Sequence, residues 1–129
     1  MTALTSPATL GDLLKLEFDP NYSRTIVTLK AGAAYPLGAV LGRITASGKY
    51  ILSPAAAVTG SEGAEIANAV LIAAVASTAA DTPALVLVRG PAIVADRALV
   101  FDASVTDAAA KALKHQQLEA HGIVVGTMA

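Results

Sequence analysis

Few residues in this sequence have the types and spacing that chemistry requires. The two histidines, His115 and His121, are six positions apart, which on a helix turns their side chains about 120° away from each other. His115 and Glu119 are four positions apart and could share one helix face, but two ligands are fewer than the three or four that zinc normally takes. We therefore interpret both histidines as solvated helix residues and expect no metal site.

The sequence also lacks the usual patterns of nucleophilic catalysis and of phosphate binding. It contains no cysteine and no Gly-x-Ser-x-Gly elbow of the kind that presents a serine nucleophile. Glu62 and Glu65 flank Gly63-Ala64 in a polar loop where water can solvate both carboxylates. The loop has no lysine in the P-loop pattern. We predict that the protein is not an enzyme and uses no cofactor.

Lys49 suggests a different class of function. It follows Ser47-Gly48 at the tip of an expected hairpin, which is where a carrier domain would hold a lysine for prosthetic-group attachment. Its flanks lack the paired methionines of biotinyl domains. A small oligomeric β-barrel binding or carrier module is therefore the alternative function.

The composition is poor in charge. Charged residues make up 15% of the chain, against roughly 25% in an average soluble domain, while hydrophobic residues make up 54% and the mean hydropathy is +0.60. A chain of 129 residues is expected to form one domain, and this one should expose apolar surface as a monomer. Burial in an oligomer or a larger assembly is the simplest remedy. The other explanation is that the chain comes from a proteome that is rich in alanine throughout.

Charge and hydropathy also bear on partners. The net charge is −1 and the lysines and arginines are scattered, so binding to nucleic acid through a basic stripe is not expected. The longest uncharged apolar stretch, Ile66–Ala80, is shorter than the ~20 residues that cross a bilayer. The N-terminus lacks a basic region followed by an apolar core, so we expect no secretory signal. Neither nucleic acid nor a membrane is an expected partner.

The stretch from Arg24 to Leu52 alternates strand-like runs with glycine turns. Its period-two alternation predicts three strands, Arg24–Lys30, Val40–Thr45 and Lys49–Leu52. The turn between the last two is short enough for a tight hairpin in which Gly48 supplies the positive φ. In the first strand, either Ile26 and Leu29 or Val27 and Leu29 would point inward. We predict that the folded part begins as a β-meander.

The second half of the chain predicts more strands and one helix. Apolar runs predict strands over Ala69–Ala76, Ala84–Arg89, Ala92–Ala95 and Ile123–Val125. Ser104 can cap a helix that ends near Gly122, where a C-terminal cap is expected. One helix face gives a shallow buried stripe of Ala109, Leu113, Gln116 and Ala120. The predicted fold is mainly β with one C-terminal helix (α+β), as a small β-barrel-like domain.

The N-terminal segment differs from the rest. Residues 1–9 are small, hydroxylated and interrupted by Pro7, which predicts a flexible arm. Five large apolar side chains follow: Leu10, Leu13, Leu14, Leu16 and Phe18. They fit either an ordinary first element docked on the core or an adhesive arm that becomes ordered on a partner by strand addition. We divide the chain into an arm, residues 1–19, and one β-rich domain, residues 20–129.

The order and spacing of these motifs resemble the head decoration protein family of tailed bacteriophages, of the lambda type. The first motifs are Tyr22-Ser23-Arg24, Val27-Thr28-Leu29, Gly32, Tyr35, Gly38, Val40-Leu41-Gly42, Ile44-Thr45 and Gly48-Lys49-Tyr50. The later features that agree are the Gly60–Gly63 loop, the apolar run from Ala69, Leu85–Arg89 and Gly122–Val125. The resemblance covers about residues 20–126.

This resemblance implies a structural virion protein with no catalytic residues and no cofactor. Such proteins form homotrimers that bind the outer surface of the expanded head at three-fold positions and help hold it against the pressure of packaged DNA. Their fold is a small β-rich domain, a β-tulip, with an extended N-terminal arm that orders on the major capsid protein.

Carried to this chain, the resemblance implies two partners, the major capsid protein and further copies of the chain itself. The protein would be made in the cytoplasm of the host bacterium and would end on the outer surface of the virion. The residues expected to contact the capsid are Leu10, Leu13, Leu14, Leu16 and Phe18.

Overall fold

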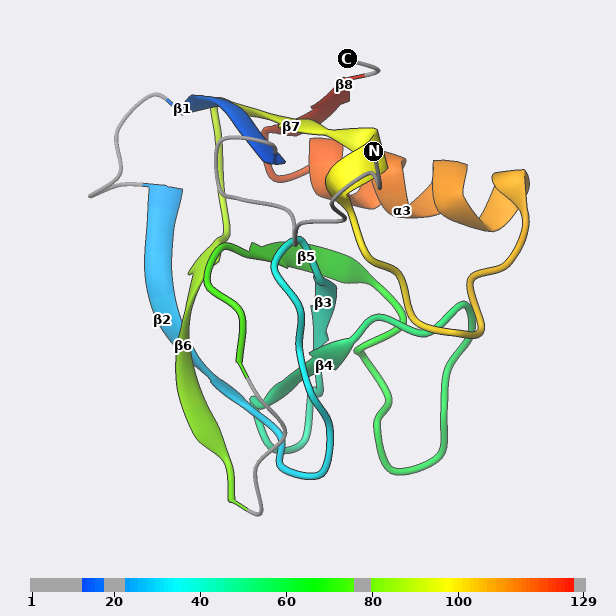
Figure 1. Cartoon of the computed structure of the whole chain (residues 1–129). Coiled ribbons are helices and arrows are strands. Elements are labelled where there is room, and N and C mark those ends of the chain that lie inside the picture. The colour runs from blue at the N-terminus through cyan, green and yellow to red at the C-terminus, as the bar shows by residue number, and fades with distance from the viewer. Residues whose placement is uncertain (1–12, 18–22, 76–79, 127–129) are drawn as a thin grey trace, which may run out of the picture.

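The computed structural model of the chain describes residues 13–17, 23–75 and 80–126. In these ranges the fold is mainly β with one long helix near the C-terminal end, as the sequence predicts (Figure 1). The strands are β1 (Leu14–Glu17), β2 (Arg24–Leu29), β3 (Val40–Arg43), β4 (Tyr50–Leu52), β5 (Ala67–Leu71), β6 (Thr82–Leu87), β7 (Ala92–Ala95) and β8 (Ile123–Gly126). The helix α3 spans Ala108–Glu119, and a 3-10 turn, η1, spans Asp96–Ala98.

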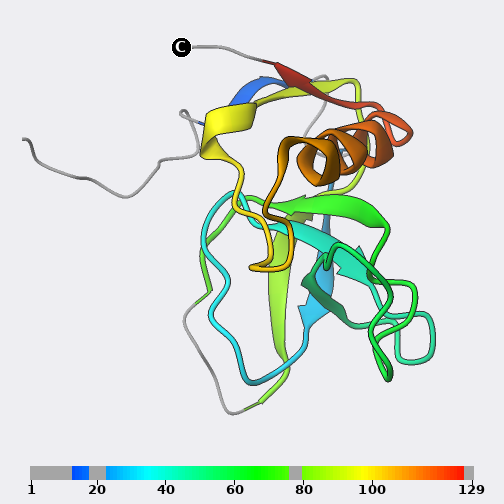
Figure 2. The same ribbon diagram turned by 90° about the vertical axis from the view of Figure 1, so that its right-hand side faces the viewer.

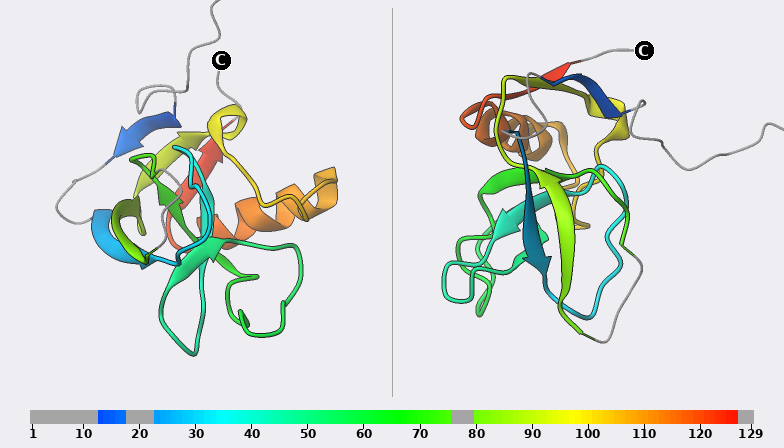
Figure 3. Two further views of the ribbon diagram at one scale, coloured as in Figure 1. Left: turned by 60° about the horizontal axis from the view of Figure 1, so that its bottom comes forward. Right: turned by 90° about the vertical axis from the view of Figure 1, so that its left-hand side faces the viewer.

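The strands form a closed barrel, in the order β2-β4-β3-β5-β6, and a three-stranded sheet, in the order β1-β7-β8. The three-stranded sheet lies above one end of the barrel, and α3 packs between β8 and the barrel strand β5 (Figures 2 and 3). One core cluster joins the sheet, the helix and the barrel, and it includes Leu13, Val70, Val94, Leu118 and Ile123. A second cluster fills the barrel and includes Leu29, Leu41, Leu71 and Val86.

The predicted meander is wrong at its first connection. Strand β2 does not pair with β3: it pairs antiparallel with β6, from Arg24–Leu87 to Leu29–Thr82, and parallel with β4 through Leu29–Tyr50. Closing the barrel brings together strands that are far apart in the sequence, which a local alternation pattern cannot show. The β3–β4 hairpin is confirmed, with Gly48 at a φ of 76° in its turn.

The structure settles two points about the strands: which side chains of β2 face inward, and where β5 ends. In β2 the inward pair is Val27 and Leu29, because Leu29 is 1% exposed while Ile26 is 68% exposed. Strand β5 is buried on both faces, as predicted, but it ends at Leu71 although the apolar run continues. Its ladder with β6 ends there, and Val75 forms only an isolated bridge.

The helix begins later than predicted and buries another face. Its N-cap is Asp107, whose Oδ1 accepts a hydrogen bond of 2.8 Å from the Ala110 amide, so the predicted Ser104 cap is wrong. Its buried residues are Lys114 and Leu118, so the predicted stripe through Leu113 is also wrong. The C-terminal glycine is confirmed, since Gly122 has a φ of 82°. No helix within the described residues is long and apolar enough to cross a membrane.

Candidate interaction surface

The described residues provide no constellation for metal binding. Among them, no group of three or more His, Cys, Asp or Glu side chains is placed to hold an ion. The His115 ring lies 6.0 Å from the Phe101 ring, centroid to centroid, at the edge of the helix. His121 is exposed just beyond the helix end. Neither histidine is buried, which agrees with their interpretation as surface residues.

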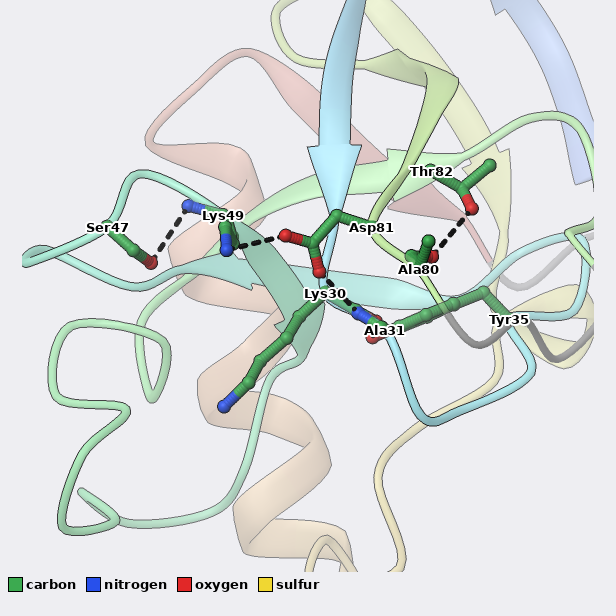
Figure 4. Close-up of polar contacts among 8 residues, drawn as sticks. All are labelled: Lys30, Ala31, Tyr35, Ser47, Lys49, Ala80, Asp81 and Thr82. Atoms are coloured by element: carbon green, nitrogen blue, oxygen red, sulfur yellow. Dashed lines mark hydrogen bonds and ion pairs between the residues drawn. The ribbon is translucent and has the colours of Figure 1, made fainter.

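Lys49, the lysine that a carrier function would need, is held by an ion pair. Its Nζ lies 2.5 Å from Asp81 Oδ2, while Asp81 Oδ1 accepts a hydrogen bond of 2.8 Å from the Ala31 amide (Figure 4). The hydrogen bond from Lys49 is the main cause that lowers the pKa of Asp81, with help from the Ala31 amide. This cluster lies where the barrel closes through the single β2–β4 pair, Leu29–Tyr50. The ion pair thus connects the residue before β4 to the residue before β6.

Two of the hollows on the described surface differ in their lining: one is mainly apolar, and the other carries several polar and charged side chains. One, of about 340 Å³, has an apolar lining of residues such as Leu37 and Leu99, with Arg97 as its charged side chain. The other, of about 260 Å³, is lined in part by Lys30, Tyr35 and Asp102. The Tyr35 hydroxyl donates a hydrogen bond of 2.8 Å to the Lys30 carbonyl, and burial raises the pKa of Tyr35. Tyr35 thus has a structural partner already.

The structure gives the five predicted capsid-contact residues different positions. Leu10 and Phe18 lie outside the described residues. Leu13 is fully buried in the core cluster that joins the sheet to the barrel, and Leu14 is partly buried against it. Leu16 is 54% exposed. Of the three described members, Leu16 is the one whose side chain is open to a partner.

Residues Leu14–Glu17, which the sequence assigned to the arm, form β1 at the edge of the three-stranded sheet. A bidentate ion pair fastens this strand to the barrel: Arg24 Nε and Nη2 donate to the two carboxylate oxygens of Glu17, each at 2.8 Å. The Glu17 side chain is only 8% exposed, and its hydrogen bond is the main cause that raises the pKa of Arg24. Residues Leu14–Glu17 are thus a first element docked on the core, which is one of the two alternatives that the sequence left open.

Sequence analysis missed Lys114, which is 1% exposed and is the largest fully buried side chain that the structure describes. Its ammonium donates to three oxygens: Ser53 Oγ at 2.9 Å, the Pro54 carbonyl at 2.6 Å and the Glu65 carbonyl at 2.6 Å. Burial is the main cause that lowers the pKa of Lys114. These bonds fasten both ends of the β4–β5 loop to α3. The one local signal is the four-residue spacing from Lys114 to Leu118, which places both on one helix face.

The described residues thus form a barrel and a three-stranded sheet that carry exposed apolar side chains. A family model described as bacteriophage lambda head decoration protein D matches residues 3–123. The chain belongs to this family. A search of curated proteins found no match. Family membership makes the chain a structural protein of the phage capsid, and it confirms the resemblance that the strand and glycine motifs predict.

Proposed function

We propose that the protein binds the outer surface of the expanded phage capsid as a homotrimer at three-fold positions. There it stabilises the head against the pressure of packaged DNA. The observation that carries this proposal is the head decoration family match over residues 3–123. The surface supports it, because large apolar side chains are exposed at Leu16, Ile26, Val58, Ile66, Leu113 and Val124.

The proposed partners are the major capsid protein and two further copies of this chain. Apolar burial would drive the contacts, at about 25 cal/mol for each Å² removed from water. A trimer presents three copies of every contact to the shell, so contacts that are weak one by one give tight binding together. The protein would be made in the cytoplasm of the host bacterium and would act on the outer surface of the virion.

Within this proposal, the segment Leu10–Phe18 carries the contact with the major capsid protein. Leu16 can contact the capsid while β1 stays paired with β7, since its side chain is exposed. Leu13 and Leu14 face the core cluster, so they would contact the capsid only after β1 had left β7. The exposed and the buried members of the segment therefore make separable contributions.

Two measurements test the proposal. Analytical ultracentrifugation of the free protein should give the mass of three chains. Co-sedimentation with expanded, empty heads of its phage should show binding, and the same heads before expansion should show none. Removing residues 1–12 leaves β1 intact and should weaken the binding. A monomer that does not bind expanded heads would refute the proposed function, and full binding without residues 1–12 would refute the contribution of that part of the arm.

A further inference from the structure

The β4–β5 loop, residues 53–66, contains a stretch whose main chain is open to water. Residues 56–60 are all exposed, and Val58 is 47% exposed. Within the part of the chain that the structure describes, the amides of residues 56–59 donate no hydrogen bond. The loop projects to one side of the barrel (Figure 1). Exposed loop tips of this kind are the preferred places for proteolytic nicking.

Both ends of this open stretch are fastened to the body of the protein. On its N-terminal side, the Ala55 amide donates a hydrogen bond of 2.9 Å to Ser104 Oγ, and the Pro54 carbonyl accepts one of 2.6 Å from Lys114. On its C-terminal side, the Glu65 carbonyl accepts a second bond of 2.6 Å from the same ammonium. A break between these points would therefore leave each new end attached close to its present position.

The strand ladders also hold together the two parts of the chain that the loop connects. Strand β3, before the loop, pairs with β5 after it, and β2 pairs with β6 along its whole length. A cut within residues 56–59 would give one piece with β1 to β4 and another with β5 to β8 and α3. The barrel and the core cluster shared by the two pieces would keep them together.

The residue types of the stretch suit one class of enzyme. Ala56, Ala57 and Val58 have small or aliphatic side chains, which the small S1 pocket of an elastase-type serine endopeptidase accepts. An extended chain with free amides can pair with the enzyme through main-chain hydrogen bonds. The enzyme's serine attacks the carbonyl carbon and the peptide C–N bond breaks. Water then completes the hydrolysis, which leaves a carboxylate on one piece and an amine on the other.

We propose that residues 56–59 are a proteolytic modification site, at which an elastase-type serine endopeptidase nicks the folded protein and leaves it folded. This site does not depend on the proposed function, because it requires neither the capsid nor the trimer. A second exposed turn also has adjacent alanines, Ala33 and Ala34. That turn is a poorer substrate, because the amides of Ala31 and Tyr35 on either side of it donate hydrogen bonds of 2.8 Å and hold it tight.

The test is limited digestion of the folded protein with pancreatic elastase, followed by mass spectrometry of the fragments and by gel filtration without denaturant. Among the described residues, the first bond cut should lie within residues 56–59. The nicked protein should elute as the uncut protein does. Replacing Ala56, Ala57 and Val58 together with aspartate should slow this cut by about tenfold or more, because an apolar pocket rejects a carboxylate. Ala34→Asp is the matched control and should leave the rate of this cut unchanged.

Several results would overturn the inference. These are a first cut elsewhere in the described residues, resistance of residues 56–59 to the enzyme, and separation of the two pieces after the cut. An unchanged rate of cutting in the triple variant would also overturn it. If the triple variant does not fold, as its melting temperature would show, the fragment masses and the elution of the nicked wild type decide the question.

Discussion

Replacing Lys114 with methionine removes a buried ammonium while keeping an unbranched side chain of similar length. The variant loses the hydrogen bonds to Ser53 Oγ and to the Pro54 and Glu65 carbonyls. Ser53 Oγ keeps one partner, because it also donates a hydrogen bond of 2.6 Å to the Ala64 carbonyl. The two carbonyls lose a donor each. The perturbation thus concerns one positive charge and two acceptors at the base of the β4–β5 loop.

The magnitude follows from two opposed effects. Each buried acceptor left without a donor costs about 1–3 kcal/mol, which gives roughly 2–6 kcal/mol for the Pro54 and Glu65 carbonyls. Methionine relieves the cost of burying a charge, which is several kcal/mol for an isolated ion and less for one with three partners. We expect a net loss of about 2 kcal/mol in the free energy of unfolding. For a chain of this length the melting temperature should fall by roughly 5–10 °C.

The assay is urea or thermal unfolding of Lys114→Met and of Lys111→Met, followed by circular dichroism. Lys111 is the matched control, since it lies three residues earlier on α3, is exposed, and has its Nζ 5.8 Å from the centroid of the Phe101 ring. Its replacement should cost less than about 1 kcal/mol. If Lys114→Met is as stable as the wild type, or if both variants lose the same amount, the hydrogen bonds of Lys114 do not stabilise the fold as argued.

The pH dependence provides an independent check on Lys114. Burial lowers its pKa in the folded state below the ordinary value of 10.5, so between the two pKa values the unfolded state binds more protons. Stability therefore rises with pH through this window. The free energy of unfolding of the wild type should increase relative to that of Lys114→Met as the pH is raised toward 10.5. A constant difference between the two proteins across this range would contradict the effect of burial.

Three further predictions follow from individual contacts. Gly42→Ala should destabilise the fold by about 3 kcal/mol or more, because its Cβ would overlap the Ala64 carbonyl oxygen; denaturant unfolding measures this. Glu17→Gln removes the ion pair with Arg24 and should lower the free energy of unfolding by about 1–2 kcal/mol. It should also speed amide hydrogen exchange in β1; unchanged exchange would contradict this. The pKa of Asp81 is lowered in the folded state, so the ionised carboxyl stabilises the wild type above pH 3.8 and this contribution is lost on acidification below it. In Asp81→Asn the free energy of unfolding should therefore fall less over this acidic range than it does in the wild type; parallel pH profiles of unfolding would refute this.

The sequence by itself determined the local elements and the family. Period-two alternation identified β2, β3 and β4, and Gly48 identified the hairpin turn, because a positive φ at a short turn is a local requirement. The order of glycines and apolar runs indicated the head decoration family, which the match over residues 3–123 confirms. These features depend on residues close together in the chain, so the sequence shows them directly.

Only the tertiary structure decided which strands pair and which side chains are free. The β2–β6 pairing and the β5 end at Leu71 depend on barrel closure, which involves partners far away in the chain. Burial separated Leu13 from Leu16, although both are leucines of the same segment. A lysine is expected at the surface from its residue type alone. Lys114 is instead an internal hydrogen-bond donor, because the β4–β5 loop places three oxygens around its ammonium. Strand register alone pairs Leu16 with Ile93 and Ile93 with Val124, since register brings residues that are distant in the sequence side by side.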